Sequence, residues 1–179
     1  MTGGVTISSM LNIVTIPDPI LRKRAEEVTK IDERILKIVD EMIYALENNP
    51  RKGIGLAAPQ VGIPIRIIIA KSGRKNDDAI TYGLINPEII KASDEKELDY
   101  EGCLSVPDTY GLVERSKKVV VKALNKNGKK VTLKASGLFA RVLQHEIDHL
   151  DGILLTEKSV GKMLTEEEYN KLIDAESKL

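Results

Sequence analysis

Both histidines of this 179-residue chain lie in the short segment QHEIDH, as His145 and His149, with Glu146 between them. On a helix, positions i and i+4 share a face, so the two imidazoles can bind one metal ion. Glu146 is poorly placed as a third ligand but well placed to take a proton from a water molecule that the ion activates. The alternative is a pair of ordinary histidines on a helix. A chain that has only two histidines, both at ligand spacing, favours metal-assisted hydrolysis.

The single cysteine, Cys103, is the other soft donor available to such an ion, and it lies in the segment YEGCLSVP. A lone cysteine is more often a small buried hydrophobic residue than a ligand. Here Gly102 and the following LSVP indicate a strand end or a tight bend, which can present a thiolate. Two imidazoles and one thiolate would leave a fourth position open for water. The backbone N–H of Leu104 could then donate to an oxyanion.

The segment GIGLAAPQVGIP, residues 53–64, is predicted to be an irregular loop with a defined backbone path, because it is rich in glycine and proline. Its Gly-x-Gly is weak evidence for a phosphate loop, since Pro59 and Pro64 exclude the helix that should follow. We expect the segment to pair with an extended substrate, and the amide of Gln60 to donate to a polarised carbonyl. The alternative is a structural turn with an exposed glutamine.

The elements that must position these residues begin with a helix. Apolar residues at helical spacing predict a helix over residues 31–49, with Asp32 as its N-cap and Pro50 ending it. Two apolar segments, residues 65–70 and 81–90, are predicted to be strands.

The second half of the chain adds a hairpin and two helices. A turn centred on Asn127-Gly128 separates two strand-like segments, which predicts a β-hairpin. Helical spacing returns from about residue 137, so the histidines are predicted to lie on a helix. A last helix is expected after Thr165, which has capping-box spacing to Glu168. Together these elements predict an α+β fold, with mostly antiparallel sheets packed around the helix that carries the H-E-x-D-H motif, plus a C-terminal helix.

Composition narrows the class of protein. Lys+Arg and Asp+Glu both number 27, so the zero net charge gives no support for nucleic-acid binding. One cysteine excludes an intramolecular disulfide and favours a reducing compartment, and no stretch approaches the length of a membrane span. We therefore expect a cytoplasmic protein. Its length fits a single domain over residues 10–179, with residues 1–9 as a poorly ordered extension.

Three segments together resemble the signature segments of peptide deformylase: GIGLAAPQ (53–60), EGCLS (101–105) and QHEIDH (144–149). They occur in that family's order and with similar separations. The segment IVTIPDPILRKRAEEV (13–28) is also similar to the start of deformylases of the bacterial type. The H-E-x-D-H motif alone is moderately specific, whereas the three segments together are highly specific, and the resemblance covers about residues 11–155.

The resemblance implies a metal-dependent hydrolase that removes the N-formyl group from the formyl-methionine of nascent polypeptides and releases formate. The family's metal ligands fall on Cys103, His145 and His149. Its catalytic carboxylate falls on Glu146. Its two oxyanion donors fall on the side chain of Gln60 and the backbone N–H of Leu104.

The resemblance also implies the cofactor and the partners. One divalent ion is expected per chain, Fe²⁺ in the cell and Zn²⁺, Ni²⁺ or Co²⁺ in preparations, because nitrogen and sulfur ligands accept all four. The expected partners are N-formylmethionyl peptides and nascent chains, with transient ribosome association left open. Direct binding to nucleic acid or to a membrane is not expected, and the chain is expected to be a monomer.

Substrate contacts follow from the same resemblance. Gly55 would make a backbone contact with an extended substrate, in the manner of an added β-strand. Ile54, Leu138 and Val142, with the ring of His145, would form the walls of an apolar methionine pocket. For each aliphatic residue the alternative is simple core packing.

Five further residues are candidates for supporting roles around the site. Glu101 and Arg115 match positions that pair in relatives, and we expect them to support the metal ligands rather than take part in the chemistry. Asp148 and Gln144 either do the same or lie on the helix surface. Arg141, one turn before the metal face, either lines the mouth of the pocket or is solvated, and we expect it to be solvated.

Two features depart from the pattern of some relatives. Tyr110 stands where several of them have an arginine beside the outer part of the substrate cleft, which leaves the preference beyond the first residues open. The last segment, residues 162–179, is net acidic, with three lysines against five carboxylates. Docking of this segment on the ribosome by simple charge attraction is therefore not supported.

Two other functions remain as alternatives to a deformylase. One is an H-E-x-x-H endopeptidase, although such enzymes take a third ligand downstream of the motif. No histidine follows His149, so only Glu157 or residues 166–168 could serve. The other is a non-catalytic metal-binding protein of the same fold. The presence of Gln60, Glu146 and all three ligands argues against it.

Overall fold

The structure is a computed structural model that describes residues 11–73 and 79–177. The extension expected at residues 1–9 lies outside the described residues. The helices are η1 (Pro19–Arg22), α1 (Glu33–Glu47), η2 (Ala58–Val61), α2 (Gly137–Leu150), α3 (Leu155–Lys158) and α4 (Glu166–Glu176). The strands are β1 (Gly55–Ala57), β2 (Ile67–Lys71), β3 (Thr81–Ala92), β4 (Lys96–Cys103), β5 (Val106–Ser116), β6 (Lys118–Leu124), β7 (Lys130–Ser136) and β8 (Leu164–Thr165).

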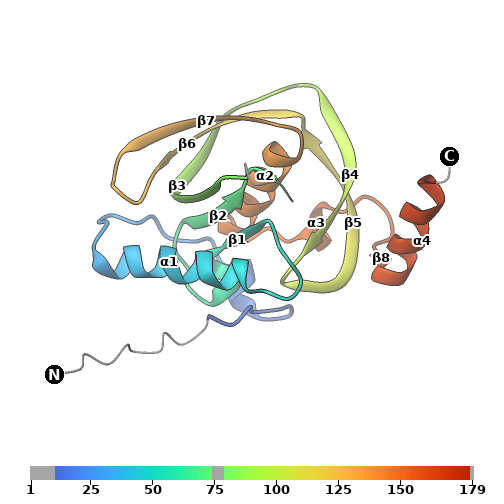
Figure 1. Cartoon of the computed structure of the whole chain (residues 1–179), viewed down its shortest axis with the longest axis horizontal. Helices are drawn as coiled ribbons and strands as arrows, with labels where there is room; N and C mark the ends of the chain where they lie inside the picture. The colour runs from blue at the N-terminus through green and yellow to red at the C-terminus, as the bar shows by residue number, and fades with distance from the viewer. Residues whose placement is uncertain (1–10, 74–78, 178–179) are drawn as a thin grey trace.

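The strands form two sheets, and every pairing between them is antiparallel. One sheet has the order β1-β2-β3-β6-β7 and the other the order β4-β5-β8. Figure 1 shows α2 near the centre of the molecule and α1 alongside β1 and β2. The predicted α+β fold, with antiparallel sheets around the helix that carries the histidines, is thus confirmed. None of the described helices is long and apolar enough to cross a membrane.

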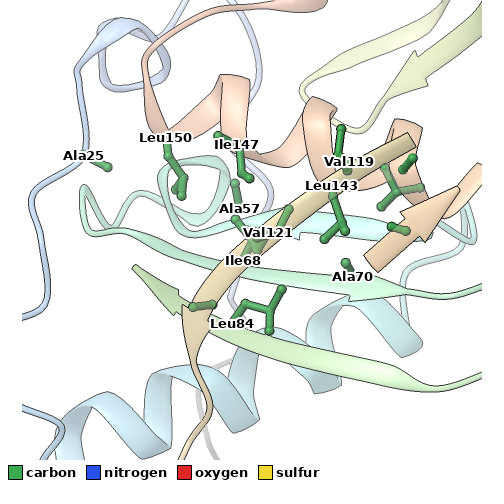
Figure 2. Close-up of a cluster of buried hydrophobic side chains, with 14 residues drawn as sticks. Ala25, Ala57, Ile68, Ala70, Leu84, Val119, Val121, Leu143, Ile147 and Leu150 are labelled. Carbon is green, nitrogen blue, oxygen red and sulfur yellow. The ribbon is translucent and has the colours of Figure 1, made fainter. Parts of the chain in front are cut away.

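Strand β2 lies between the two helical layers and is buried on both faces. Its alternate residues Ile68 and Ala70 pack with Leu143 and Ile147 of α2 (Figure 2). Ile67 and Ile69 point to the other face and belong to a second cluster of buried apolar side chains, which includes the buried residues of α1. This double burial explains why the segment is a continuous apolar run rather than an alternating pattern. It also fixes α2, and hence the histidines, against the rigid centre of the sheet.

The structure confirms the predicted helix caps and the predicted hairpin turn. Asp32 caps α1 by accepting a hydrogen bond from the Ile35 N–H at 3.1 Å. Thr165 and Glu168 form the predicted capping box of α4. The hairpin is present as β6 and β7, with Gly128 in the left-handed region at φ 72°.

The prediction of an irregular loop over residues 53–64 was wrong for part of the segment. Gly55–Ala57 forms β1, which pairs with β2, and residues 58–61 form the 3-10 helix η2. Leu56 and Ala57 are fully buried, so burial of an apolar strand outweighs the local glycine and proline signals. The long hairpin β4–β5 was predicted only at its Cys103 end, because residues 96–99 are exposed in succession and two of its buried positions are the charged Glu101 and Arg115, so no apolar–polar alternation marks it.

Candidate metal centre and active-site cleft

A cleft of about 520 Å³ runs between the segment around β1, the β4–β5 hairpin and α2. Its lining includes all the predicted contact residues for substrate and oxyanion: Ile54, Gly55, Gln60, Leu104, Leu138 and Val142. Cys103, His145 and Glu146 also line it. The sequence-predicted site residues, which come from three separate segments, are therefore brought to one place.

Cys103, His145 and His149 offer ligand atoms that all lie within 4.8 Å of one another. Within the described part of the chain, no other group of three histidine, cysteine or acidic residues has this geometry. The Cys103 Sγ lies 3.2 Å from the His149 Nε2. A bulge at Gly102/Cys103 ends the regular β4–β5 pairing and turns the thiol toward α2.

The chemistry of this donor set fits a divalent transition metal. Burial opposes ionisation of Cys103, but the two neighbouring imidazoles outweigh it and hold the pKa of the thiol well below its usual range. The thiolate is the form that binds metal. With two imidazole nitrogens it gives a three-ligand set, as in catalytic sites that keep a position open.

Glu101 orients the His145 ring. Its Oε2 lies 2.9 Å from His145 Nδ1, which leaves Nε2 free to face the cluster. Arg115 donates to both carboxylate oxygens, at 2.9 and 3.0 Å. Burial alone would raise the pKa of Glu101, but the hydrogen bonds from His145 and Arg115 outweigh it and bring the pKa below its usual range. Glu101 is therefore ionised and fully partnered, as expected for a carboxylate behind a metal-binding histidine.

The expectation that Arg141 is solvated was wrong. It is only 7% exposed. Its guanidinium donates to Glu101 Oε1 at 2.8 Å, to the Val113 carbonyl at 2.9 Å and to the Glu97 carbonyl at 2.8 Å. Its position one turn before the metal face points it at Glu101, so a charge on this buried face of α2 is satisfied rather than exposed.

Two further α2 side chains tie the helix to β5. Asp148, 18% exposed at its side chain, accepts a short hydrogen bond from Arg115. The amide of Gln144 donates to the Ser116 carbonyl at 2.9 Å and accepts from the Ser116 N–H at 3.1 Å. Both residues thus hold the helix in register with the strand, and neither is merely helix surface.

Glu146 differs from Glu101 because its carboxylate lacks a full set of hydrogen-bond partners. It is 4% exposed, and its buried Oε2 has no hydrogen-bond partner. Burial raises its pKa to about 7, while the charges of His145 and His149 act in the opposite direction. A buried carboxyl with a raised pKa in a cleft is typical of a group that exchanges a proton during catalysis.

Gln60 is held in one orientation. Its Oε1 accepts from the Ala57 N–H at 2.8 Å, so its Nε2 points the other way, 3.6 Å from Cys103 Sγ and 3.2 Å from Ser105 Oγ. The amide group therefore faces Cys103 of the cluster on one side and the hydroxyl of Ser105 on the other. Gln60 is 1% exposed, so the alternative of a turn with an exposed glutamine is excluded.

Several residues in or beside the cleft were missed in the sequence. Ser105, fully buried beside Gln60, stood inside the EGCLS segment and could have been found there. Glu166 and Tyr169 of α4 also line the cleft. No local pattern signals their position, because it depends on how α4 packs against the β4–β5 sheet.

Comparison with known proteins decides the family. The sequence model of the polypeptide deformylase family matches residues 10–163. The chain belongs to the peptide deformylase family. The peptide deformylase of Natranaerobius thermophilus is 46% identical over 157 residues, which cover 88% of this chain and 97% of that relative. The peptide deformylase of Thermodesulfovibrio yellowstonii is 45% identical over 150 residues, covering 84% of this chain and 89% of the relative.

Solved deformylase structures share the fold. The crystal structure of peptide deformylase from Thermotoga maritima has a TM-score of 0.79 and 41% identity, covering 86% of this chain and 100% of that chain. The Synechococcus elongatus deformylase, solved in complex with actinonin, has a TM-score of 0.78 and 35% identity, covering 92% and 85% of the two chains. The resemblance inferred from three short segments therefore extends over almost the whole described chain.

Proposed function

We propose that this metal-dependent deformylase hydrolyses the N-formyl group of formyl-methionine at the start of nascent polypeptides and releases formate. The observation that carries the proposal is the pairing of the Cys103–His145–His149 cluster with Glu146, whose carboxylate is buried without a full set of partners. Cys103, His145 and Glu146 line one cleft of about 520 Å³, a volume that supports the binding of a short peptide.

Cys103, His145 and His149 would hold one divalent ion, which we propose is Fe²⁺ in the cell. Zn²⁺, Ni²⁺ and Co²⁺ are compatible with the same donors. When bound, such an ion supplies Lewis acidity, which makes a water molecule acidic enough to be deprotonated near neutral pH.

Glu146 is the proposed proton carrier. It accepts a proton from the attacking water as oxygen bonds to the formyl carbon. It then donates that proton to the amine nitrogen as the C–N bond breaks, so water and the formamide become formate and a free amine. Its burial limits exchange of that proton with bulk water and raises the pKa of its carboxyl above the usual range, which favours its role as a proton acceptor and donor.

Gln60 and Leu104 are the proposed oxyanion donors. The carbonyl of Gln60 is fixed by the Ala57 N–H, which holds its amide nitrogen on the side of Cys103 and supports it as a donor to developing negative charge. Leu104 directly follows Cys103, begins the two-residue turn before β5 and lines the same cleft, which supports its backbone N–H as the second donor.

The substrate is proposed to lie along β1. This strand is at the edge of its sheet, so one side of Gly55 can pair with an extended peptide. Ile54, Leu138 and Val142 offer apolar surface for the methionine side chain. A formyl group carries only hydrogen on its carbonyl carbon, so a confined site can admit it and exclude larger acyl groups.

An endopeptidase is disfavoured because the third donor of the cluster is Cys103, upstream of the H-E-x-D-H motif, rather than a residue downstream of it. Glu157, a downstream candidate, is engaged with the Leu154 N–H at 2.9 Å and with Arg22 at 3.1 Å, away from the histidines. The proposed substrates are formyl-methionyl nascent chains. We further propose that the enzyme is a monomer that acts in the cytoplasm, and transient contact of α4 with the ribosome is left open.

The test is formate release from formyl-Met-Ala by protein loaded anaerobically with Fe²⁺, with Zn²⁺-loaded protein in parallel. The variant Glu146→Ala is compared with Glu88→Gln, a change at an exposed carboxylate of β3. We expect formate release by the parent and by Glu88→Gln, and loss of release in Glu146→Ala with its metal retained. A folded, metal-loaded parent that releases no formate would contradict the proposal.

A further inference from the structure

The C-terminal helix contributes an aromatic side chain to the mouth of the cleft. Tyr169 of α4 stacks on Tyr110 of β5, with ring centroids 4.0 Å apart and an interplanar angle of 12°. Tyr100 of β4 meets the edge of Tyr169 at 5.6 Å and 61°. All three tyrosines are half-buried and line the cleft. Together Tyr100, Tyr110 and Tyr169 are called the tyrosine wall below.

The tyrosine wall is fixed by backbone pairing. Strand β8 pairs with β5, with Thr165 opposite Thr109 and Leu164 opposite Tyr110. The capping box at Thr165 starts α4 directly after this pairing, so Tyr169 comes one turn later, facing Tyr110. Figure 1 shows α4 beside β5, on the side of the molecule that carries the β4–β5 sheet.

The wall begins next to the metal-binding candidates. Tyr110 lies opposite Gly102 in the β4–β5 pairing, and a Cβ on Gly102 would lie 3.1 Å from the Tyr110 ring. Gly102 directly precedes Cys103. The rings therefore line the part of the cleft that adjoins the strand end carrying Cys103.

The charges at this end also matter. Glu166, in the first turn of α4, lines the cleft beside the wall, and Asp99 of β4 does so too. Asp108 and Arg51, which also line it, face each other at 3.3 Å. Lys52 also lines the cleft, but from the segment before β1, whereas Asp99 and Glu166 lie on the two elements that carry Tyr100 and Tyr169. At the wall itself an acidic substrate side chain would therefore approach two like charges, whereas an aromatic side chain would meet ring faces.

We propose that α4 is part of the substrate site, and that the tyrosine wall selects aromatic and apolar side chains in the residues after formyl-methionine. Tyr169 is the specificity-determining residue, because it supplies the ring that α4 adds to the cleft. The family match ends at residue 163, before this helix begins. This inference rests on the proposed function, because it assigns part of the same cleft.

The experiment measures kcat/KM for formyl-Met-Ala, formyl-Met-Phe-Ala, formyl-Met-Ala-Phe and the matching peptides with Asp in place of Phe. The Fe²⁺-loaded parent is compared with Tyr169→Ala, Tyr169→Phe and Glu166→Gln. Tyr44→Ala is the matched control, because Tyr44 is exposed on α1 and does not line the cleft. Thermal unfolding of each variant reports any loss of folding.

We expect the parent to prefer Phe to Asp at one of the two positions. In Tyr169→Ala the ratio of kcat/KM for the Phe peptide to that for formyl-Met-Ala should fall roughly 2- to 10-fold, mainly through KM. In Tyr169→Phe, which keeps the ring, and in the control Tyr44→Ala, this ratio should equal the parent value. Glu166→Gln should raise kcat/KM for the Asp peptide alone.

Other outcomes would overturn the proposal. Equal ratios in the parent and Tyr169→Ala would show that the wall only braces α4. If Tyr169→Ala is too unstable to assay, Glu166→Gln still tests the proposal. Equal kcat/KM values for the Asp peptides in Glu166→Gln and in the parent would count against a substrate role for the helix. Absence of formate release from formyl-Met-Ala by the parent would instead contradict the proposed function itself.

Discussion

Two buried glutamates flank the same histidine and differ in almost every other respect. Glu101 is held by Arg115, Arg141 and His145, and its pKa lies below the usual range. Glu146 has one oxygen without a partner, and burial raises its pKa to about 7. Burial is similar, at 6% and 4% exposed. The difference shows that partners, rather than burial, decide whether a carboxylate positions its neighbour or is free to exchange a proton.

The variant Glu146→Gln tests this difference between the two glutamates most strongly. The amide keeps the shape of the side chain but cannot carry a proton, so kcat should fall roughly 10²- to 10⁴-fold. Metal content, measured by elemental analysis, should stay at the parent value, because Glu146 is not in the ligand cluster. Full activity in this variant would remove Glu146 from the chemistry.

A second variant displaces Glu146 without changing it. A Cβ built on Gly55 would overlap the Glu146 carboxylate and lie 2.9 Å from its Cγ, so Gly55→Ala must move that side chain. We expect kcat/KM to fall about 10²-fold, as for small misplacements of catalytic groups. Gly73→Ala is the matched control, because a Cβ there meets nothing within 4 Å. Similar rates in the two variants would mean that the carboxylate tolerates displacement.

The opposite side of the comparison is tested by Glu101→Gln. His145 loses a charged partner and two buried guanidinium groups lose their shared carboxylate. We expect metal affinity to fall about 10- to 100-fold, and the free energy of unfolding to fall by about 3 kcal/mol. Competition with a chelator and chemical denaturation measure the two effects. Glu95→Gln, which removes a solvent-exposed partner of Lys117, should change neither appreciably.

The smallest expected effect is in the pH profile. Glu146 must be ionised to accept a proton, so kcat/KM should rise with pH through its pKa. That pKa is about 7 without a metal ion beside it, and a bound metal cation favours the carboxylate. The acid limb of the Fe²⁺-loaded enzyme is therefore expected below pH 7. An acid limb above pH 7 would mean that the limb reports another group.

The sequence predicted which candidate metal ligands and carboxylate come together better than it predicted the residues packed around them. His145, His149 and Glu146 were readable because a helix fixes their relative positions, and Cys103 because the chain offers no other thiol. Arg141 was misjudged because its partners lie on β4 and β5, far away in the chain. Strand β1 was missed for a similar reason, since its stability comes from pairing with β2 rather than from local preference.

The outer end of the cleft was the least predictable part. Tyr110 was noticed as a departure from relatives, but nothing in the sequence placed Tyr169 beside it. That contact requires the two-residue pairing of β8 with β5, which is too short to leave a strand pattern.

The measurement that tests the central claim most directly is a side-by-side assay of Glu146→Gln and Glu101→Gln, with kcat and bound Fe²⁺ determined on the same samples. If Glu146 carries the proton and Glu101 holds the ligand, the first variant keeps its metal and loses turnover. The second loses metal readily but turns over in proportion to the metal it retains. Turnover in metal-loaded Glu146→Gln equal to the parent, or none in metal-loaded Glu101→Gln, would contradict the account.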